Sequence, residues 1–102
     1  MHEVTLKGFE DGTLSVALSG EIDFGNADGF FASVMDGYQA NVGNLCFDCT
    51  DLTFIDSTTL GTFVKILKMV KSDGFTLRLT NLQPKIKKLF VICSLDSIME
   101  LA

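Results

Sequence analysis

Segments in which every second residue is apolar alternate along this chain with segments whose apolar residues follow helical spacing, and this alternation constrains the fold most. Residues 3–7 and 13–19 show the period of two that is typical of strands with one buried face. Residues 27–38 and 60–70 carry apolar side chains at intervals of three and four, the period of an amphipathic helix. Alternating strand and helix patterns are typical of an α/β protein with a parallel sheet.

Four shorter segments complete the pattern. Residues 45–49 form a β-compatible run after a Gly-Asn breaker pair, and residues 75–80 alternate again. A proline opens a helical pattern over residues 84–93, and residues 95–99 indicate a short terminal helix. The expected order is therefore β-β-α-β-α-β-α-α.

This order predicts one α/β domain over residues 1–102, with about four strands in a mixed sheet and about four helices. The first two strands form an antiparallel hairpin. Each later strand follows a β-α-β crossover, which makes the strands at 13–19, 45–49 and 75–80 parallel to one another.

Composition narrows the class of partner. Eight Lys and Arg against 13 Asp and Glu give a net charge of −5, which argues against a nucleic-acid partner because no basic surface neutralises phosphates.

Lys65 and Lys68 interrupt the most apolar helical stretch, which falls short of the roughly 20 apolar residues of a membrane span. No secretory signal is recognisable, and three cysteines favour free thiols in a reducing compartment. We therefore expect a cytoplasmic protein without membrane insertion.

Polar side chains gather where the predicted parallel strands end. The loops that follow such strands meet at one edge of the sheet, where ligands tend to bind. Four carboxylates and three consecutive hydroxyls are expected at this edge: Glu21, Asp23, Asp51, Asp56, Ser57, Thr58 and Thr59.

The pair Asp56-Ser57 has two interpretations. As an N-cap, its side-chain oxygen accepts from an unpaired N–H in the first helical turn, which stabilises a helix by about 1 kcal/mol. As a modification site, a hydroxyl at a helix N-terminus is well placed for phosphorylation, because free N–H groups and the positive end of the helix dipole receive the added charge. The two interpretations are compatible.

Three stretches resemble the STAS domain of bacterial anti-sigma factor antagonists, in order and spacing across essentially the whole chain. They are residues 20–23 (GEID), 51–61 (DLTFIDSTTLG) and 84–90 (PKIKKLF). The resemblance implies that Ser57, directly after Asp56, is the regulatory phosphoserine. It also implies partner switching: the unphosphorylated protein binds a kinase-type anti-sigma factor and frees a sigma factor, the kinase then phosphorylates the serine, and a phosphatase restores it.

The resemblance also implies a set of partner-binding residues, with one departure among them. The usual Asp-Ser-Ser-Gly-Leu-Gly has Thr59 in place of its first glycine, where we expect an exposed branched side chain that limits a partner's approach. Thr58 and Thr59 are then lesser candidates for phosphorylation. The partner-binding residues implied are Asp23, Asp56, Ser57, Thr58, Thr59 and Gly61.

Two other functions remain open on the sequence. The first is suggested by Thr59, which replaces the usual glycine. It is a STAS subunit that is not phosphorylated, such as a component of a lipid-transport ATPase complex or a stressosome-type scaffold. A hydrolase using Ser57 needs a general base, and the only histidine is His2. We therefore expect no enzymatic activity.

We expect neither a metal nor a cofactor. Cys46 and Cys49 match a C-x-x-C spacing, but residues three apart on a strand face opposite sides of the sheet, so the two thiols do not share a site.

Overall fold

The computed structural model describes residues 2–102, and their helices and strands alternate as the sequence patterns predict. The elements in chain order are β1 (His2–Glu10), β2 (Thr13–Ile22), α1 (Ala27–Ala40), β3 (Asn44–Ile55), α2 (Ser57–Ser72), β4 (Leu77–Thr80), α3 (Pro84–Ile92), the 3₁₀ helix η1 (Leu95–Ser97) and β5 (Glu100–Leu101). The predicted fold class is confirmed, with five strands in the sheet rather than about four.

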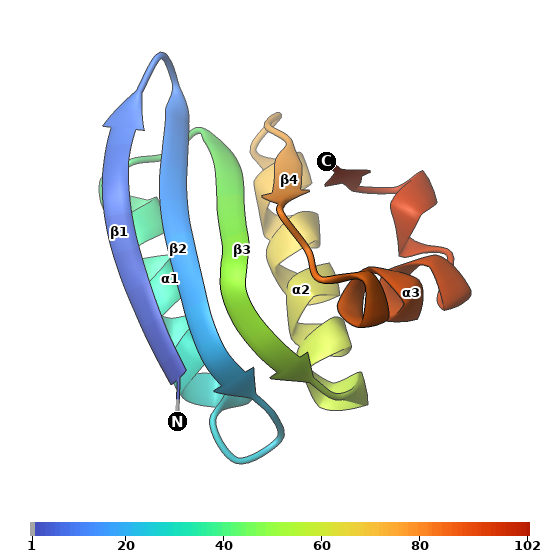
Figure 1. The fold of residues 1–102 in the computed structure, drawn as a ribbon. Coiled ribbons are helices and arrows are strands. Elements are labelled where there is room, and N and C mark those ends of the chain that lie inside the picture. Colours follow the sequence, from blue (N-terminus) through green and yellow to red (C-terminus); the bar gives the residue numbers. More distant parts are fainter. Residues whose placement is uncertain (1) are drawn as a thin grey trace.

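The strands form one mixed sheet in the order β1-β2-β3-β4-β5. The hairpin β1–β2 is antiparallel, whereas β2, β3, β4 and β5 are parallel to their neighbours. Figure 1 shows α1 and α2 behind the sheet, whose other face is left open, and α3 to the side past the end of β4. Because β2 and β3 run in the same direction, the β2–α1 loop and the start of α2 lie at the same end of the sheet.

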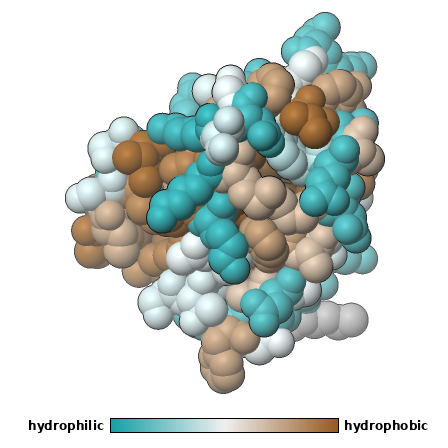
Figure 2. Space-filling model, turned by 180° about the vertical axis from the view of Figure 1, so that it is seen from behind, coloured by the Kyte–Doolittle hydropathy of each residue, from teal (hydrophilic) through white to brown (hydrophobic). Residues whose placement is uncertain are grey.

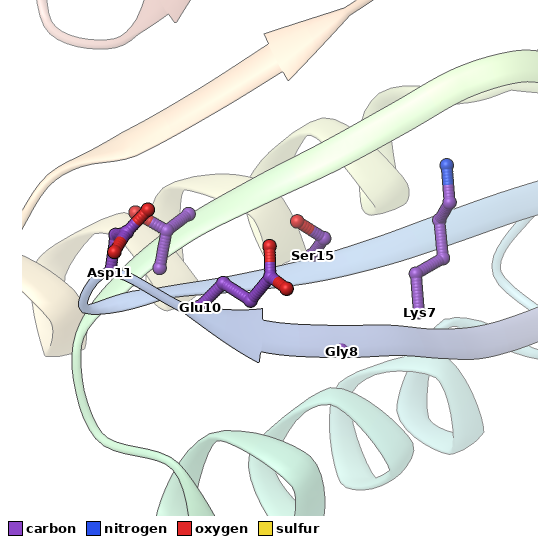
Figure 3. Close-up of a pocket in the computed structure, with 6 residues that line it drawn as sticks. Lys7, Gly8, Glu10, Asp11 and Ser15 are labelled. Carbon is purple, nitrogen blue, oxygen red and sulfur yellow. The ribbon is translucent and has the colours of Figure 1, made fainter.

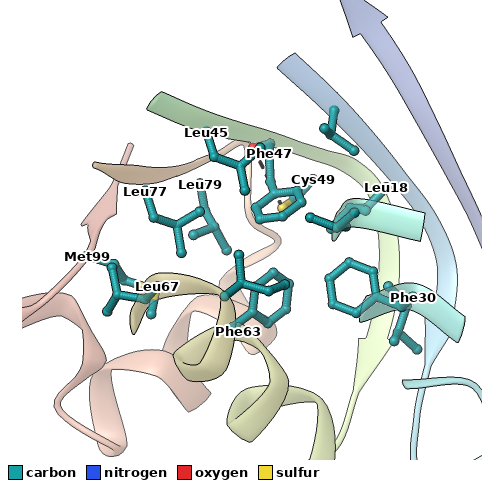
Figure 4. Close-up of a cluster of buried hydrophobic side chains, with 14 of the residues drawn as sticks. Leu18, Phe30, Leu45, Phe47, Cys49, Phe63, Leu67, Leu77, Leu79 and Met99 are labelled. Carbon is teal, nitrogen blue, oxygen red and sulfur yellow. Dashed lines mark hydrogen bonds between the residues drawn. The ribbon is translucent and has the colours of Figure 1, made fainter. Parts of the chain in front are cut away.

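The core lies between the sheet and the two helices behind it (Figure 4). The ring of Phe63 on α2 is 5.2 Å from that of Phe30 on α1, 5.5 Å from that of Phe47 on β3 and 5.5 Å from that of Phe90 on α3. All four rings are fully buried. Each helix is therefore held to the sheet or to its neighbour through one central aromatic cluster.

Strand β3 is longer than predicted. It runs from Asn44 to Ile55 instead of over residues 45–49, so the expected loop at 50–56 is mostly strand. Opposite β2 it holds two extra residues, one between the pairs Ala17↔Asp48 and Ser19↔Asp51 and one just before Phe54. Such bulges break the period of two and place exposed residues next to each other, which removes the sequence signal of a strand.

The C-terminal segment also differs from the prediction. The expected terminal helix is only the 3₁₀ helix η1, and the chain then adds β5 to the free edge of β4. Ser94, between α3 and η1, has a positive φ of 60°, so the two do not form one continuous helix. The amide of Ala102 donates to the carbonyl of Leu79 at 2.8 Å. A strand of two residues has no periodicity, so only this pairing reveals it.

The helical side of the molecule shows hydrophilic and hydrophobic surface interspersed, and strongly hydrophobic surface gathers at the side formed by the C-terminal segment (Figure 2). Val91, Ile92 and Ile98 are among the exposed apolar residues. No helix within residues 2–102 has the length and apolar character that crossing a membrane requires.

Candidate functional site

Helix α2 begins at Ser57, and Asp56 is its N-cap. The Asp56 backbone is extended, and its Oδ1 accepts a hydrogen bond from the amide of Thr59 at 3.0 Å. This is the capping geometry that the sequence predicts, in which a carboxylate partners one of the amides left free in the first turn. The cap fixes the backbone on both sides of Ser57.

The second carboxylate oxygen of Asp56 reaches a different element. Its Oδ2 accepts from the amide of Phe24, in the β2–α1 loop, at 2.9 Å. The hydrogen bond from the Thr59 amide, followed by that from the Phe24 amide, lowers the pKa of Asp56 below its usual value of 3.8. Asp56 is therefore ionised at neutral pH, and both of its oxygens are engaged by donors other than Ser57.

Thr59 is buried, which corrects the expectation that it lies exposed at the start of the helix. Its side chain has no solvent exposure, and its hydroxyl donates to the carbonyl oxygen of Ile22 at 2.5 Å. The Asp56 carboxylate lies 3.0 Å from the same hydroxyl. The branched side chain points inward under the end of β2, so it does not obstruct a partner.

The other residues of the motif lie on the surface. Ser57 and Thr58 are exposed in the first turn of α2, and Gly61 is exposed one turn later. A Cβ built on Gly61 would have no neighbour within 4 Å. Ser57, Thr58 and Gly61 therefore form an accessible strip, with Thr59 beneath it.

Asp23 is half-buried and bonded within its own loop. Its Oδ1 accepts from the amide of Gly25 at 2.9 Å, and its own amide donates to Oδ1 of Asn26 at 2.9 Å. These bonds turn the chain from β2 into α1, which is a common role of loop aspartates. The structure brings Asp23 beside Asp56 through Phe24, the residue that follows it.

The expected group of four carboxylates is only partly assembled. Glu21 and Asp23 lie at the end of β2 and Asp56 at the start of α2, but Asp51 lies within β3, in register with Ser19. Its expected position at the edge was wrong because β3 continues past it.

Sequence reasoning missed a small apolar groove at the end of β3, just before the N-cap of α2. It has a volume of about 190 Å³ and lies between the end of β3 and α3. Lys85 lines it from α3, and Phe54, which lines it from β3, is 44% exposed. A pattern within either segment does not reveal the groove, because its walls come from elements about 30 residues apart: Thr53, Phe54, Ile55, Lys85, Ile86 and Leu89.

A larger depression, of about 470 Å³, lies beside the turn that joins β1 to β2 (Figure 3). Lys7 and Ser15 line it on the face that α1 does not cover. The Lys7 ammonium is 3.2 Å from a carboxylate oxygen of Asp48. Bonds from the hydroxyl and amide of Thr50 hold the pKa of Asp48 well below its usual range. Because the hairpin turn is at the opposite end of β2 from Ile22, this depression is separate from the Ser57 site.

The two cysteines of the C-x-x-C pattern lie on different faces of β3, as predicted. Cys49 is buried in the core, and burial raises its pKa to about 12, whereas Cys46 is half-buried on the open face. Within residues 2–102, no group of three or more His, Cys, Asp or Glu side chains is placed to hold a metal ion.

The chain as a whole resembles known proteins. Residues 7–102 match the STAS domain family. The anti-sigma-B factor antagonist of Bacillus subtilis strain 168 is 42% identical to this chain over 52 residues. That match covers 51% of this chain and 48% of the relative, so it spans about half of either protein.

Three solved structures share the fold. A protein of Thermotoga maritima, described as a candidate anti-sigma factor antagonist, is 26% identical with a TM-score of 0.84, over 92% of this chain and 81% of its own. An anti-sigma factor antagonist from Mycobacterium paratuberculosis is 19% identical with a TM-score of 0.85, over 99% and 85%. The Bacillus cell fate determinant SpoIIAA in its phosphorylated form is 22% identical with a TM-score of 0.75, over 98% and 91%. The last two show the fold alone.

Proposed function

We propose that this chain, which belongs to the STAS domain family, is a non-enzymatic anti-sigma factor antagonist that works as a phosphorylation-controlled binding switch. In its unphosphorylated form it binds a kinase-type anti-sigma factor, which then releases a sigma factor. Phosphorylation of Ser57 by that kinase ends the complex, and a serine phosphatase restores the binding form.

The observation that supports this proposal most is the exposed hydroxyl of Ser57 at the first position of α2. A kinase reaches a hydroxyl only if the side chain and the backbone around it are accessible, and Thr58 and Gly61 keep this strip open. The free amides of the first turn and the helix dipole tolerate the added phosphate. The start of α2 therefore accepts the modification without unfolding.

The same surroundings explain why phosphate ends binding. Asp56 is ionised next to Ser57, and Glu21 and Asp23 lie at the neighbouring end of β2. Phosphorylation adds a charge of about −1.5 to −2 at pH 7 to a surface that is already acidic. A loss of about 2.8 kcal/mol of binding free energy weakens an affinity a hundredfold. In a close contact, repulsion between the phosphate and the acidic residues, together with the desolvation of the phosphate, accounts for a loss of this size in binding free energy.

Burial of Thr59 bears on two alternatives. A fully buried hydroxyl is out of a kinase's reach, so Thr58 is the remaining alternative acceptor. The reason for considering a STAS subunit that is not phosphorylated was a branched side chain in the partner's path. Thr59 points inward, so this reason falls away.

The proposal is tested with the kinase-type anti-sigma factor of the organism that encodes this chain, purified and incubated with this protein and ATP. Mass spectrometry should detect one phosphate on the wild type and on Thr58→Ala, and none on Ser57→Ala. Ser57→Asp should bind the anti-sigma factor at least tenfold more weakly than the wild type. Full phosphorylation of Ser57→Ala would contradict the assignment of the acceptor, and a wild type that neither binds nor is phosphorylated would contradict the function.

A further inference from the structure

We propose that Phe24 is the apolar anchor of the contact with the anti-sigma factor and determines which anti-sigma factor this chain binds. The partner surface that fits it is an apolar pocket with Lys or Arg side chains at its rim. This inference rests on the proposed function, because it assigns the chemistry of the partner at the same face.

Phe24 is unusually exposed for a phenylalanine. Its side chain is 81% exposed, more than any other large apolar residue within residues 2–102, the next being Ile92 at 67%. Single exposed apolar residues are common on protein surfaces. Phe24 differs from them because its backbone amide donates a hydrogen bond to Asp56, the residue just before the candidate phosphorylation site.

The loop that carries Phe24 is ordered by its own hydrogen bonds. The amide of Gly25 donates to Asp23 Oδ1 at 2.9 Å, and Asn26 Nδ2 donates to the carbonyl of Glu21 at 3.0 Å. The amide of Ala27 donates to the carbonyl of Asp23 at 2.8 Å. These bonds hold the backbone on both sides of Phe24, so a partner that covers its ring pays little entropy to order the loop.

Two hydrogen bonds tie this loop and the end of β2 to the start of α2. One runs from the Phe24 amide to Asp56, and the other runs from the Thr59 hydroxyl to the carbonyl of Ile22. Figure 1 shows the β2–α1 loop and the start of α2 at the same end of the sheet. A kinase that approaches the exposed Ser57 therefore meets Phe24 on the same face.

The charges around Phe24 indicate the chemistry of the partner. Residues 21–28 and 54–59 together contain four acidic residues and no Lys, Arg or His: Glu21, Asp23, Asp28 and Asp56. A buried aromatic ring within a polar rim is the usual arrangement of the residues that dominate a protein interface. An apolar pocket with basic residues at its rim complements this arrangement in both shape and charge.

The test compares Phe24→Ala with Val42→Ala. Val42 is 49% exposed and follows the C-terminus of α1, at the opposite end of the molecule from Phe24. The probe is the purified anti-sigma factor of the same organism, with affinity measured by calorimetry and Ser57 phosphorylation followed in steady state. Phe24→Ala should bind at least tenfold more weakly and raise the KM for phosphorylation by a similar factor. Its kcat and its thermal unfolding midpoint should stay close to those of the wild type, as should every property of Val42→Ala.

The outcomes separate this inference from the function on which it rests. If Ser57→Asp loses binding while Phe24→Ala binds within twofold of the wild type, Phe24 is no anchor and the proposed function stands. If Phe24→Ala lowers kcat without raising KM, the ring does not act in docking and the inference fails. If the wild type binds no anti-sigma factor, both proposals fail.

Discussion

Asp56 and Thr59 hold the start of α2 against the end of β2. Asp56 accepts from the amide of Phe24, and the hydroxyl of Thr59 donates to the carbonyl of Ile22. Loop and helix cannot separate without breaking both bonds. The exposure of Ser57, between these two residues in the sequence, is therefore a property of an ordered backbone.

At this scale we predict the effect of removing one hydroxyl. Thr59→Val keeps the shape of the side chain but leaves the carbonyl of Ile22 without its donor, and an unsatisfied buried group costs about 1–3 kcal/mol. We expect the free energy of unfolding to fall by about 1–2 kcal/mol in urea denaturation.

Thr58→Val is the matched control for this prediction. It makes the same change at the exposed neighbour, where surface substitutions usually alter stability by less than about 0.5 kcal/mol. Equal losses in the two variants would show that the buried hydrogen bond of Thr59 contributes nothing specific.

The helices behind the sheet are joined to each other at two levels. In the core, the rings of Phe30 on α1 and Phe63 on α2 are 5.2 Å apart. Nearer the surface, the hydroxyl of Tyr38 on α1 donates to Asp73, at the C-cap of α2, at 2.8 Å. Both ends of α2 are thus bonded to other elements, to α1 at its C-terminus and to β2 and its loop at its N-terminus.

For this pair of helices we predict a dependence of stability on alkaline pH. Burial first, and then the bond and charge of Asp73, raise the pKa of Tyr38 from 10.0 to about 12 in the folded protein. The neutral phenol therefore stabilises the fold fully below pH 10, and this contribution is lost as the pH rises from 10 to about 12. Tyr38→Phe should be less stable at neutral pH by about 1 kcal/mol, as for an ordinary hydrogen bond, because the charged partner Asp73 is exposed.

Urea unfolding at a series of pH values tests this prediction. The difference in stability between the wild type and Tyr38→Phe should shrink between pH 10 and about 12. A difference that stays constant across this range would contradict it.

At the scale of the whole molecule, the net charge of −5 and its distribution govern association. Residues 21–28 and 54–59 carry only acidic charges, and Lys85 lies at the groove on the α3 side, so a basic partner is attracted to the side of this end that the β2–α1 loop forms. Attraction of this kind raises the association rate more than it slows dissociation, and salt screens it.

We therefore predict that binding of the anti-sigma factor depends on salt mainly through the association rate. Between about 0.05 and 0.5 M NaCl, the association rate measured by stopped flow should fall several-fold, while the dissociation rate changes little. Glu21→Gln should weaken this salt dependence, whereas Glu10→Gln, at the hairpin turn, should leave it unchanged. A dissociation rate that carries most of the salt effect would contradict electrostatic steering to this face.

How far each feature was predictable depends on the distance between the residues that create it. The N-cap at Asp56 and the start of α2 were predicted, because a cap involves residues three positions apart. The burial of Thr59 was not, because it depends on Ile22, 37 positions away in the sequence. The full length of β3 could not be predicted for a related reason, because its bulges are defined only by its pairing with β2.

Periodicity and local motifs were enough to establish the α/β order, the directions of the main strands and the position of Ser57 at a helix start, because backbone geometry imposes these patterns on neighbouring residues. Folding in three dimensions turned Thr59 inward, joined Phe24 to Asp56 and added β5 at the sheet edge. These features arise from contacts between segments far apart in the chain, which leave no periodic trace in either segment.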